Sequence, residues 1–197
     1  MMSAPLLDHL VLLVPSLASA STSFASASGL EIIPGGTLAD GVTENVLVVF
    51  PDGVCASAFP SLPRCMILAL TRYIRRQDIE LIAFTTSSTP AARANHWWGD
   101  KADGWIDWAL CPAPASTSDR IKAVNAKAGS KIYQEPVDGG RLTKQGRQLE
   151  WKVAFPVLEV GQTRGVRPFW CGDVTERAWR VSLFIRTLQL GRFQTAS

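Results

Sequence analysis

The sequence predicts an α+β fold built from two copies of one βαβββ unit. The same order of elements, a strand, a helix, a glycine and then three strands, occurs twice along the 197 residues. The glycine that ends the helix stands at Gly29 in the first half and at Gly129 in the second. Hydrophobic residues make up 47% of the chain, which is enough to bury a core in a domain of this length.

In the first half, short apolar runs and their flanking residues define the elements. Leu10–Val14 is continuous and branched, which is typical of a buried strand. Ser16 is suited to cap a helix that ends at Gly29. Pro34-Gly35-Gly36 and Asp52-Gly53 predict turns, the second of them in a hairpin. The three further strands are expected at Leu30–Ile33, Asn45–Phe50 and Ile79–Phe84.

The second half repeats this order. Trp105–Leu110 is predicted to be a strand, and Ser116 or Thr117 can cap a helix that runs to Ala128. Gly139-Gly140 predicts a turn. The other extended segments are expected at Lys131–Tyr133, Leu149–Phe155 and Arg167–Cys171.

Two segments differ in charge from the rest of the chain. Residues 55–78 hold four arginines and one aspartate, and residues 182–197 hold two arginines and no acidic residue. The formal charge of +3 therefore comes from these segments, and the remainder is slightly acidic. A net charge this small, confined to these two segments, does not indicate a nucleic-acid partner.

The four cysteines form no C-x-x-C pair and show no regular spacing, so neither a zinc knuckle nor a disulfide framework is predicted. Leu6–Ala20 resembles a secretion signal in its apolar centre, but it lacks a basic start and is interrupted by Asp8 and His9. The other interpretation of this stretch is a buried strand followed by a helix. No run reaches the roughly 18 apolar residues of a membrane helix, and we expect a cytoplasmic protein without a membrane partner.

Eight motifs, in order, resemble the glyoxalase-like domain proteins common in fungi and bacteria, which belong to the vicinal-oxygen-chelate superfamily. The motifs are LDHLVLLVP at 7–15, PGGT at 34–37, NVLVVFPDG at 45–53, IELIAF at 79–84, HWWG at 96–99, GWIDWAL at 104–110, LEWKVAFP at 149–156 and PFWCGDVT at 168–175. The resemblance implies two βαβββ modules whose curved mixed sheets enclose a cavity. It does not fix the activity, because the superfamily includes glyoxalase I, extradiol dioxygenases and bleomycin-resistance proteins.

The resemblance also divides the chain into regions. It implies a first module at 1–90, a linker at 91–103, a second module at 104–181 and a tail outside the family pattern at 182–197. Residues 55–78 interrupt the first module at the hairpin. We interpret this segment and the tail as translated intron, because Val54-Cys55 and Val181-Ser182 can be encoded by splice-donor sequences. A genuine long loop is the alternative.

His9 and Glu80 stand where the first module of metal-dependent relatives supplies a His and a carboxylate. The resemblance therefore implies that they bind a divalent metal, Zn²⁺, Fe²⁺, Mn²⁺ or Ni²⁺, and that Glu80 also moves a proton as the catalytic residue. The alternative is a hydrogen-bonded pair, or two groups on the exposed face of the sheet. The second module has no His, and Cys171 and Asp173 are the metal-ligand residue types near its last strand.

Four further residues are predicted to contact the ligand. Asp107 faces either the cavity or solvent, and Arg141 is either a carboxylate clamp or a solvated strand end. Trp105 and Trp170 are included because all seven tryptophans lie between positions 97 and 179, so that one side of the cavity is expected to be aromatic. The segment His96-Trp97-Trp98-Gly99 is either a ligand-stacking rim or a plug between the modules.

Three functions remain open at this point. The first is a metal-assisted lyase, isomerase or dioxygenase that acts on a small vicinal-oxygen substrate. The second is a metal-free module that binds or sequesters a small molecule, as bleomycin-resistance proteins do. The third is an impaired splice product. In each functional case the partner is a small molecule, and the protein is a monomer or a homodimer. No G-x-S-x-G, P-loop or G-x-G-x-x-G motif supports a hydrolase, an NTPase or a dinucleotide-binding enzyme.

Overall fold

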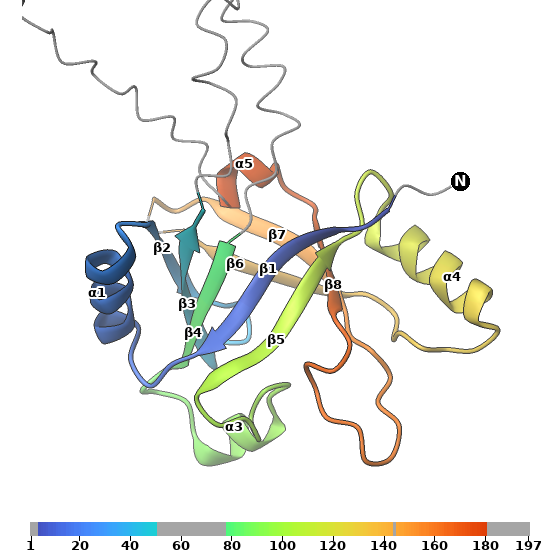
Figure 1. The fold of residues 1–197 in the computed structure, drawn as a ribbon, viewed down its shortest axis with the longest axis horizontal. Coiled ribbons are helices and arrows are strands. Elements are labelled where there is room, and N and C mark those ends of the chain that lie inside the picture. Colours follow the sequence, from blue (N-terminus) through green and yellow to red (C-terminus); the bar gives the residue numbers. More distant parts are fainter. Residues whose placement is uncertain (1–3, 51–77, 144, 181–197) are drawn as a thin grey trace, which may run out of the picture.

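The computed structural model describes residues 4–50, 78–143 and 145–180 and shows two βαβββ units in one curved sheet (Figure 1). This confirms the predicted fold class. The first unit consists of β1 (Leu6–Leu13), α1 (Leu17–Ser28), β2 (Glu31–Thr37), β3 (Thr43–Val49) and β4 (Asp78–Phe84). The second consists of β5 (Gly104–Cys111), α4 (Thr117–Ala128), β6 (Val137–Leu142), β7 (Gln148–Ala154) and β8 (Phe169–Asp173). Two short helices, α3 (Pro90–Asn95) and α5 (Arg177–Arg180), lie between the units and after the second.

The sheet joins the two units through their first strands. Its strand order is β2-β3-β4-β1-β5-β8-β7-β6. β1 and β5 pair antiparallel at the centre, and each is also parallel to the last strand of its own unit. The two outer edges approach each other where Ala39 N donates to Gly140 O over 2.9 Å and Leu38 bridges to Arg141. The sheet is therefore nearly closed into a barrel.

The two long helices begin and end where the sequence predicts. Ser16 Oγ accepts a hydrogen bond from Ser19 N at the start of α1, and Gly29 follows its end with a φ of 65°. At α4 the cap is Ser116, whose Oγ accepts from Asp119 N, and Gly129 has a φ of 66°. The positive φ explains the glycines, because an L side chain is strained in that conformation.

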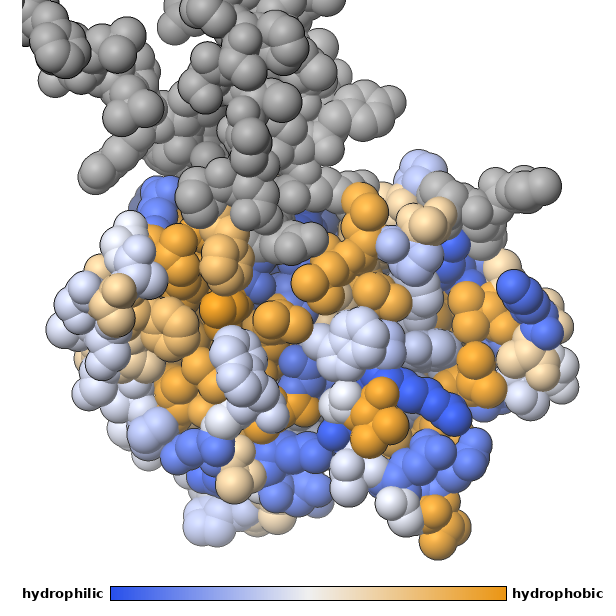
Figure 2. All heavy atoms as spheres, viewed as in Figure 1, coloured by the Kyte–Doolittle hydropathy of each residue, from blue (hydrophilic) through white to orange (hydrophobic). Residues whose placement is uncertain are grey.

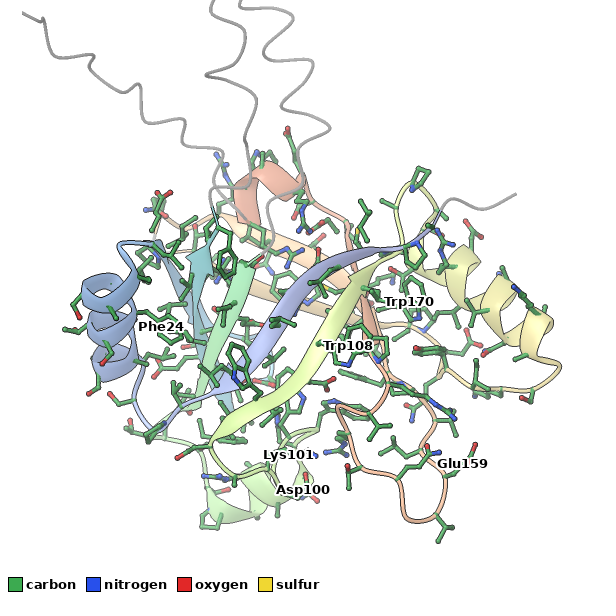
Figure 3. The ribbon with its side chains drawn as sticks, in the orientation of Figure 1. Phe24, Asp100, Lys101, Trp108, Glu159 and Trp170 are labelled. Carbon is green, nitrogen blue, oxygen red and sulfur yellow. The ribbon has the colours of Figure 1, made fainter. Side chains whose placement is uncertain are left out.

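Alternation along β4 separates the two faces of the sheet. Ile79, Leu81 and Ala83 lie in an apolar cluster with α1, whose Phe24 points toward the strands (Figure 3). Glu80 and Ile82 face the inside of the curve, where Ile82 belongs to a second buried cluster. On the outer surface, polar residues gather around α3 at the lower edge of the view in Figure 2.

Two irregular pairings occur where β1 and β5 meet. Leu7 pairs with Leu110 and His9 with Ala109, so Asp8 is an extra residue on β1. Such a bulge re-aims side chains, and here both Asp8 and His9 are buried. On β5, Ile106 is likewise an extra residue, because Val11 pairs with Asp107 and Leu12 with Trp105. Ile106 and Asp107 are both buried.

The structure corrects two of the predicted turns. Gly139 and Gly140 lie inside β6, where a Cβ on Gly139 would meet Trp151 Nε1 at 2.3 Å. The glycine makes room for an indole and does not form a turn. Pro34-Gly35-Gly36 lies within β2, an edge strand, where a missing N–H is tolerated. The expected Lys131–Tyr133 strand is reduced to one bridge, between Tyr133 and Pro156.

Some predictions fall on residues that are not described. The Asp52-Gly53 turn, the predicted insertion up to residue 77 and the tail at 182–197 lie outside the described residues. Asp78, the last residue of the predicted insertion, is the first residue of β4. Across the described ranges, none of the helices combines the length and the apolar character needed to cross a membrane.

Candidate active-site cavity

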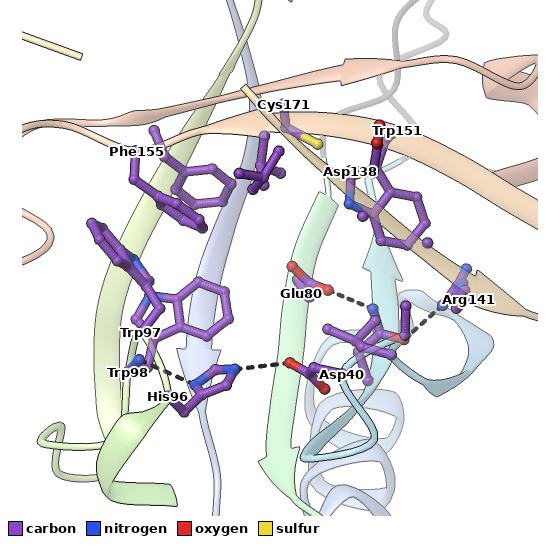
Figure 4. Close-up of a pocket in the computed structure, with 18 of the residues that line it drawn as sticks. Asp40, Glu80, His96, Trp97, Trp98, Asp138, Arg141, Trp151, Phe155 and Cys171 are labelled. Atoms are coloured by element: carbon purple, nitrogen blue, oxygen red, sulfur yellow. Dashed lines mark hydrogen bonds and ion pairs between the residues drawn. The ribbon is translucent and has the colours of Figure 1, made fainter. Parts of the chain in front are cut away.

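A cavity of about 320 Å³ lies inside the curve of the sheet and is lined by both units (Figure 4). The first unit supplies the polar side chains of His9, Asn45 and Glu80. Most of the aromatic wall comes from the segment between the units and from the second unit. The aromatic residues of this wall are Trp97, Trp98, Trp151, Phe155 and Phe169.

His9 lies between two carboxylates. Its Nδ1 is 2.9 Å from Asp8 Oδ2, and its Nε2 is 3.3 Å from Glu80 Oε2. Burial by itself would lower the pKa of this imidazole, but the contacts with Asp8 and Glu80 outweigh it and raise the pKa to about 10. His9 is therefore an imidazolium at neutral pH, hydrogen-bonded to Asp8 through Nδ1 and in ion-pair contact with Glu80 through Nε2, which makes no hydrogen bond to any described group.

Glu80 is held as a carboxylate. Burial opposes its charge, but the contacts with His9 and a short hydrogen bond donated by Asn45 Nδ2 to Oε1 lower its pKa. The side chain is 13% exposed and lines the cavity, so a ligand there can reach it. Glu80 is thus a base fixed by two neighbours and accessible from the cavity.

Asp8 is anchored from the opposite side by the last helix. Its Oδ2 accepts from Arg180 Nη2 over 3.0 Å, and its Oδ1 forms an ion pair with Arg177. Arg180 Nε in turn donates to Asp173 Oδ1 over 2.7 Å. The arginines keep the pKa of Asp8 well below its ordinary range despite complete burial. The orientation of His9 therefore depends on α5.

Arg141 reaches the same cavity from β6, the opposite edge of the sheet. Its Nη1 donates to Asn45 Oδ1 over 2.6 Å, and the same oxygen accepts from Gly36 N over 3.3 Å. A Cβ on Gly35 would lie 2.0 Å from Asn45 O and 2.5 Å from Arg141 Nη1, so this close approach requires a glycine. Arg141 is only 4% exposed, and burial lowers its pKa.

Asp107 organises the aromatic wall from behind. Its Oδ2 accepts from the indole N–H groups of Trp98, over 2.9 Å, and Trp97, over 3.2 Å, while Oδ1 accepts from Trp108 N. Trp97 stacks on Phe155 with ring centroids 3.9 Å apart. Trp98 both lines the cavity and lies in the buried core, 7% exposed. The two indoles thus close the gap between the units and form part of the cavity wall.

The structure brings together some of the residues chosen from the sequence. His9, Glu80 and Arg141 line one cavity, and Asp107 lies behind its wall. Trp105 and Trp170 do not line it. Trp105 is 61% exposed beside a separate open depression. Trp170 packs against Tyr133 near α4 (Figure 3).

Sequence reasoning missed three contributors to this network: Asp8, Asn45 and Arg180. Asp8 carried a signal because, with His9, it interrupts an otherwise apolar strand. Asn45 carried less of one, because it follows Thr43 and Glu44 at the polar start of β3. Arg180 carried none, since a lone arginine near the end of a chain is ordinarily a solvated side chain.

A divalent metal at this place would need three protein ligands and an open position, or four ligands. His9 Nε2 and Glu80 Oε2 lie close enough to each other to share an ion. Cys171 lies within 4.8 Å of donor atoms of His9 and Asp8, but burial raises the pKa of its thiol well above the ordinary value and disfavours the metal-binding thiolate. Asp8 and Asp107 are engaged by the arginines and the indoles. The described residues thus offer a pair, His9 with Glu80, and a group of three, Asp8, His9 and Cys171, in which the arginines that hold Asp8 and the protonated thiol oppose metal binding.

Comparison with protein families gives one match, to the family model described as "Glyoxalase-like domain", over residues 7–54 and 65–196. The gap at 55–64 lies inside the predicted insertion, whereas 65–78 and 182–196, which the sequence analysis set apart, fall inside the match. No curated protein matches the chain.

Solved structures share the fold at low identity. A hypothetical protein from Staphylococcus aureus gives a TM-score of 0.60 at 14% identity; the alignment covers 88% of this chain and 61% of that longer one. A hypothetical protein from Bacillus halodurans gives 0.54 at 17% identity, with 88% and 98% covered. Methylmalonyl-CoA epimerase from Mycobacterium tuberculosis gives 0.52 at 14% identity, with 91% and 97% covered. At these identities the likeness shows the fold alone.

Proposed function

Because the chain belongs to the glyoxalase-like domain family, we propose that it is a small-molecule enzyme that moves a proton at a carbon next to a carbonyl group, with Glu80 as the base. The observation that carries the proposal is the pairing of a carboxylate with an imidazolium, 3.3 Å apart, on the wall of an aromatic cavity. One group accepts a proton and the other donates a hydrogen bond, which is the division of roles that such a reaction needs.

The proposed reaction is an enolisation followed by return of the proton. Glu80 Oε2 takes the proton from carbon as the C–H bond breaks, and the electron pair moves onto the carbonyl oxygen. His9 Nε2–H donates a hydrogen bond to the oxygen anion that forms. The protonated Glu80 exchanges its proton with solvent water and then returns a proton to the same carbon as the enolate collapses to the carbonyl, which gives hydrogen exchange with solvent.

Two structural features favour this chemistry at Glu80. The indoles of Trp97 and Trp98 exclude water from one side of the cavity, which strengthens the electrostatic contact between His9 and a developing oxyanion. The anchoring of Asp8 by Arg180 fixes the imidazole, so it needs little reorganisation during the reaction. The lowered pKa of Glu80 makes it a modest base while His9 Nε2 contacts its carboxylate, and a substrate oxygen that takes over this contact would strengthen the base.

The divalent metal stays a prediction. In that version His9 and Glu80 hold the ion, which would polarise the substrate oxygen as a Lewis acid, and further ligands would have to come from the substrate, from water or from residues outside those described. A metal-free binding module is the remaining alternative. The expected cytoplasmic location and the oligomeric state also stay predictions. Structural neighbours titled as methylmalonyl-CoA epimerase hold CoA esters, which supports a small-molecule ligand here.

Deuterium incorporation tests the proposal even while the natural substrate is unidentified. The purified full chain is incubated in D₂O with hydroxyacetone, 2-hydroxyacetophenone or phenylpyruvate, and proton NMR follows loss of the signal next to the carbonyl. We expect exchange above background with at least one probe, and no such exchange with Glu80→Gln. Background rates with all three probes, or equal exchange with the variant, would contradict the proposal and favour a binding module.

A further inference from the structure

Arg141 differs from the two arginines that hold Asp8. Arg177 and Arg180 each form ion pairs with Asp8 and Asp173. Within the described ranges no carboxylate lies within ion-pair distance of Arg141, whose side chain bonds to the neutral amide oxygen of Asn45. Its Nε is buried and makes no hydrogen bond to any described group. Arg141 therefore carries a positive charge into the cavity without a direct counter-charge.

A buried cation without an ion-pair partner is less stable than a paired one, although Glu80 and Asp78 act on Arg141 electrostatically. Removing a guanidinium from water is unfavourable, and a well-placed anion offsets that cost. Burial lowers the pKa of Arg141 and the charge of Glu80 raises it, and a guanidinium stays protonated. A ligand anion that enters the cavity would thus gain an unusually strong, directional partner.

Asn45 places this cation beside the proposed base. Its amide oxygen accepts from Arg141, and its amide nitrogen donates to Glu80, so one side chain separates the two groups (Figure 4). A ligand group bound to Arg141 would therefore hold the neighbouring carbon atoms near Glu80. The aromatic wall, including Trp151 and Phe155, remains available for the rest of the ligand.

We propose that the substrate of the Glu80 site is a small carboxylic acid, a 2-oxo or 2-hydroxy acid with a flat apolar substituent, whose carboxylate binds to Arg141. This inference rests on the proposed function. A single negative charge matches Arg141, which, unlike the cavity-lining Arg180, forms no ion pair with a described carboxylate. A phosphate dianion fits less well, because Asp40, Glu80 and Asp138 also line the cavity and would repel a second charge.

Matched pairs of acid and amide isolate the contribution of the carboxylate. Binding of benzoate, phenylacetate and 3-phenylpropionate is measured by calorimetry, each beside its amide and beside phenyl phosphate. For at least one pair, wild-type protein should bind the acid about tenfold or more tightly than the amide, a difference of about 1.4 kcal/mol. No preference for any acid, including no binding of any acid, would overturn the inference, as would tighter binding of phenyl phosphate.

Variants then assign the preference to one residue. Arg141→Met should bring the acid-to-amide ratio close to one, and Arg141→Lys should keep part of it because an ammonium retains the charge. Arg147→Met is the matched control, since Arg147 is exposed and stacks on Trp179, and it should keep the wild-type ratio. A ratio that survives Arg141→Met would refute the assignment. The wild-type comparison itself does not depend on how any variant folds.

Glu80→Gln separates this inference from the proposed function. This variant should lose deuterium exchange and keep its preference for the acid, because the carboxylate contact is made by Arg141. If wild-type protein prefers acids and shows no exchange, the binding inference stands and the proposed reaction fails. If exchange depends on Glu80 and no acid is preferred, the reaction stands and the role of Arg141 fails.

Discussion

His9 Nε2 lies 3.3 Å from Glu80 Oε2, and this contact joins the first and last strands of the first unit inside the cavity. It depends on two neighbours that share no contact with each other. The bulge at Asp8 turns a carboxylate toward His9, and Asn45 donates to the far oxygen of Glu80. His9 and Glu80 are therefore each held from the side away from their mutual contact, and both still face the cavity, where a ligand can reach them.

Asp78 predicts a pH dependence of stability that is separate from the reaction. It is 1% exposed, neither carboxylate oxygen has a hydrogen-bond partner among the described residues, and burial raises its pKa from 3.8 to about 6. A raised pKa means that the native state holds the proton more tightly, so stability falls as the pH rises from about 4 through 6. Asp78→Asn should then stabilise the protein by about 3 kcal/mol at pH 7.5 and by little at pH 4.

Urea unfolding of the wild type and the variant at both pH values measures this difference. Asp103→Asn is a suitable control, because Asp103 is exposed, and it should change stability equally at the two pH values. A constant effect of Asp78→Asn across this range would show that the carboxyl group is not protonated in the native state near pH 4.

Asp107 should support the aromatic wall. Asp107→Ala removes the acceptor for the indole N–H groups of Trp97 and Trp98, and an unsatisfied buried donor costs about 1–3 kcal/mol. We expect a loss of about 3 kcal/mol in the free energy of unfolding, measured by urea denaturation. Asp107→Asn keeps an oxygen acceptor and should lose less. Equal, small losses for both variants would mean that the indoles do not depend on this residue.

Arg180 should matter more for stability than an exposed arginine does. Arg180→Met leaves Asp8 and Asp173 without one of their buried partners, and breaking such a pair costs about 3–5 kcal/mol. Arg167→Met breaks an exposed pair with Glu159 and should cost less than about 1 kcal/mol. Thermal and urea unfolding of the two variants, side by side, measures the contrast. Similar losses would show that the Asp8 network is not buried as described.

Metal content separates the two versions of the proposed chemistry. Because two arginines hold Asp8 and burial keeps the Cys171 thiol protonated, we expect chain incubated with Zn²⁺, Fe²⁺, Mn²⁺ or Ni²⁺ and then desalted to retain well under one ion per chain. Elemental analysis of the wild type, His9→Ala and Glu80→Ala measures this. One ion per wild-type chain, lost in both variants, would establish the metal site that the sequence predicts.

The sequence predicts the fold well because its signals are local. Ser16 with Gly29 and Ser116 with Gly129 define both helices, since capping and positive φ depend on the immediate chain. The turn predicted at Gly139-Gly140 is wrong. Gly139 makes room for the indole of Trp151, its partner on the neighbouring strand β7. A local pattern does not distinguish these two uses of glycine.

The site is only partly predictable for the same reason. His9 and Glu80 stand out as polar residues in apolar strands, and Arg141 follows two glycines. The link from Arg141 to Asn45 spans 96 positions and depends on the near closure of the sheet. The link from Arg180 to Asp8 spans 172 positions. Trp105 and Trp170 are aromatic like the wall, but Trp105 lies on an exposed face and Trp170 in a separate buried cluster, because neighbouring strand residues face opposite ways.

The most direct test of the central claim is the rate of deuterium exchange in Glu80→Gln relative to Glu44→Gln. Glu44 lies on the adjacent strand β3, next to Asn45 in sequence and outside the residues that line the cavity. With the most reactive probe, Glu80→Gln should lower the rate by a factor of roughly 10² or more, the usual contribution of a general base, while Glu44→Gln stays at the wild-type rate. Equal rates in the two variants would show that Glu80 is not the base.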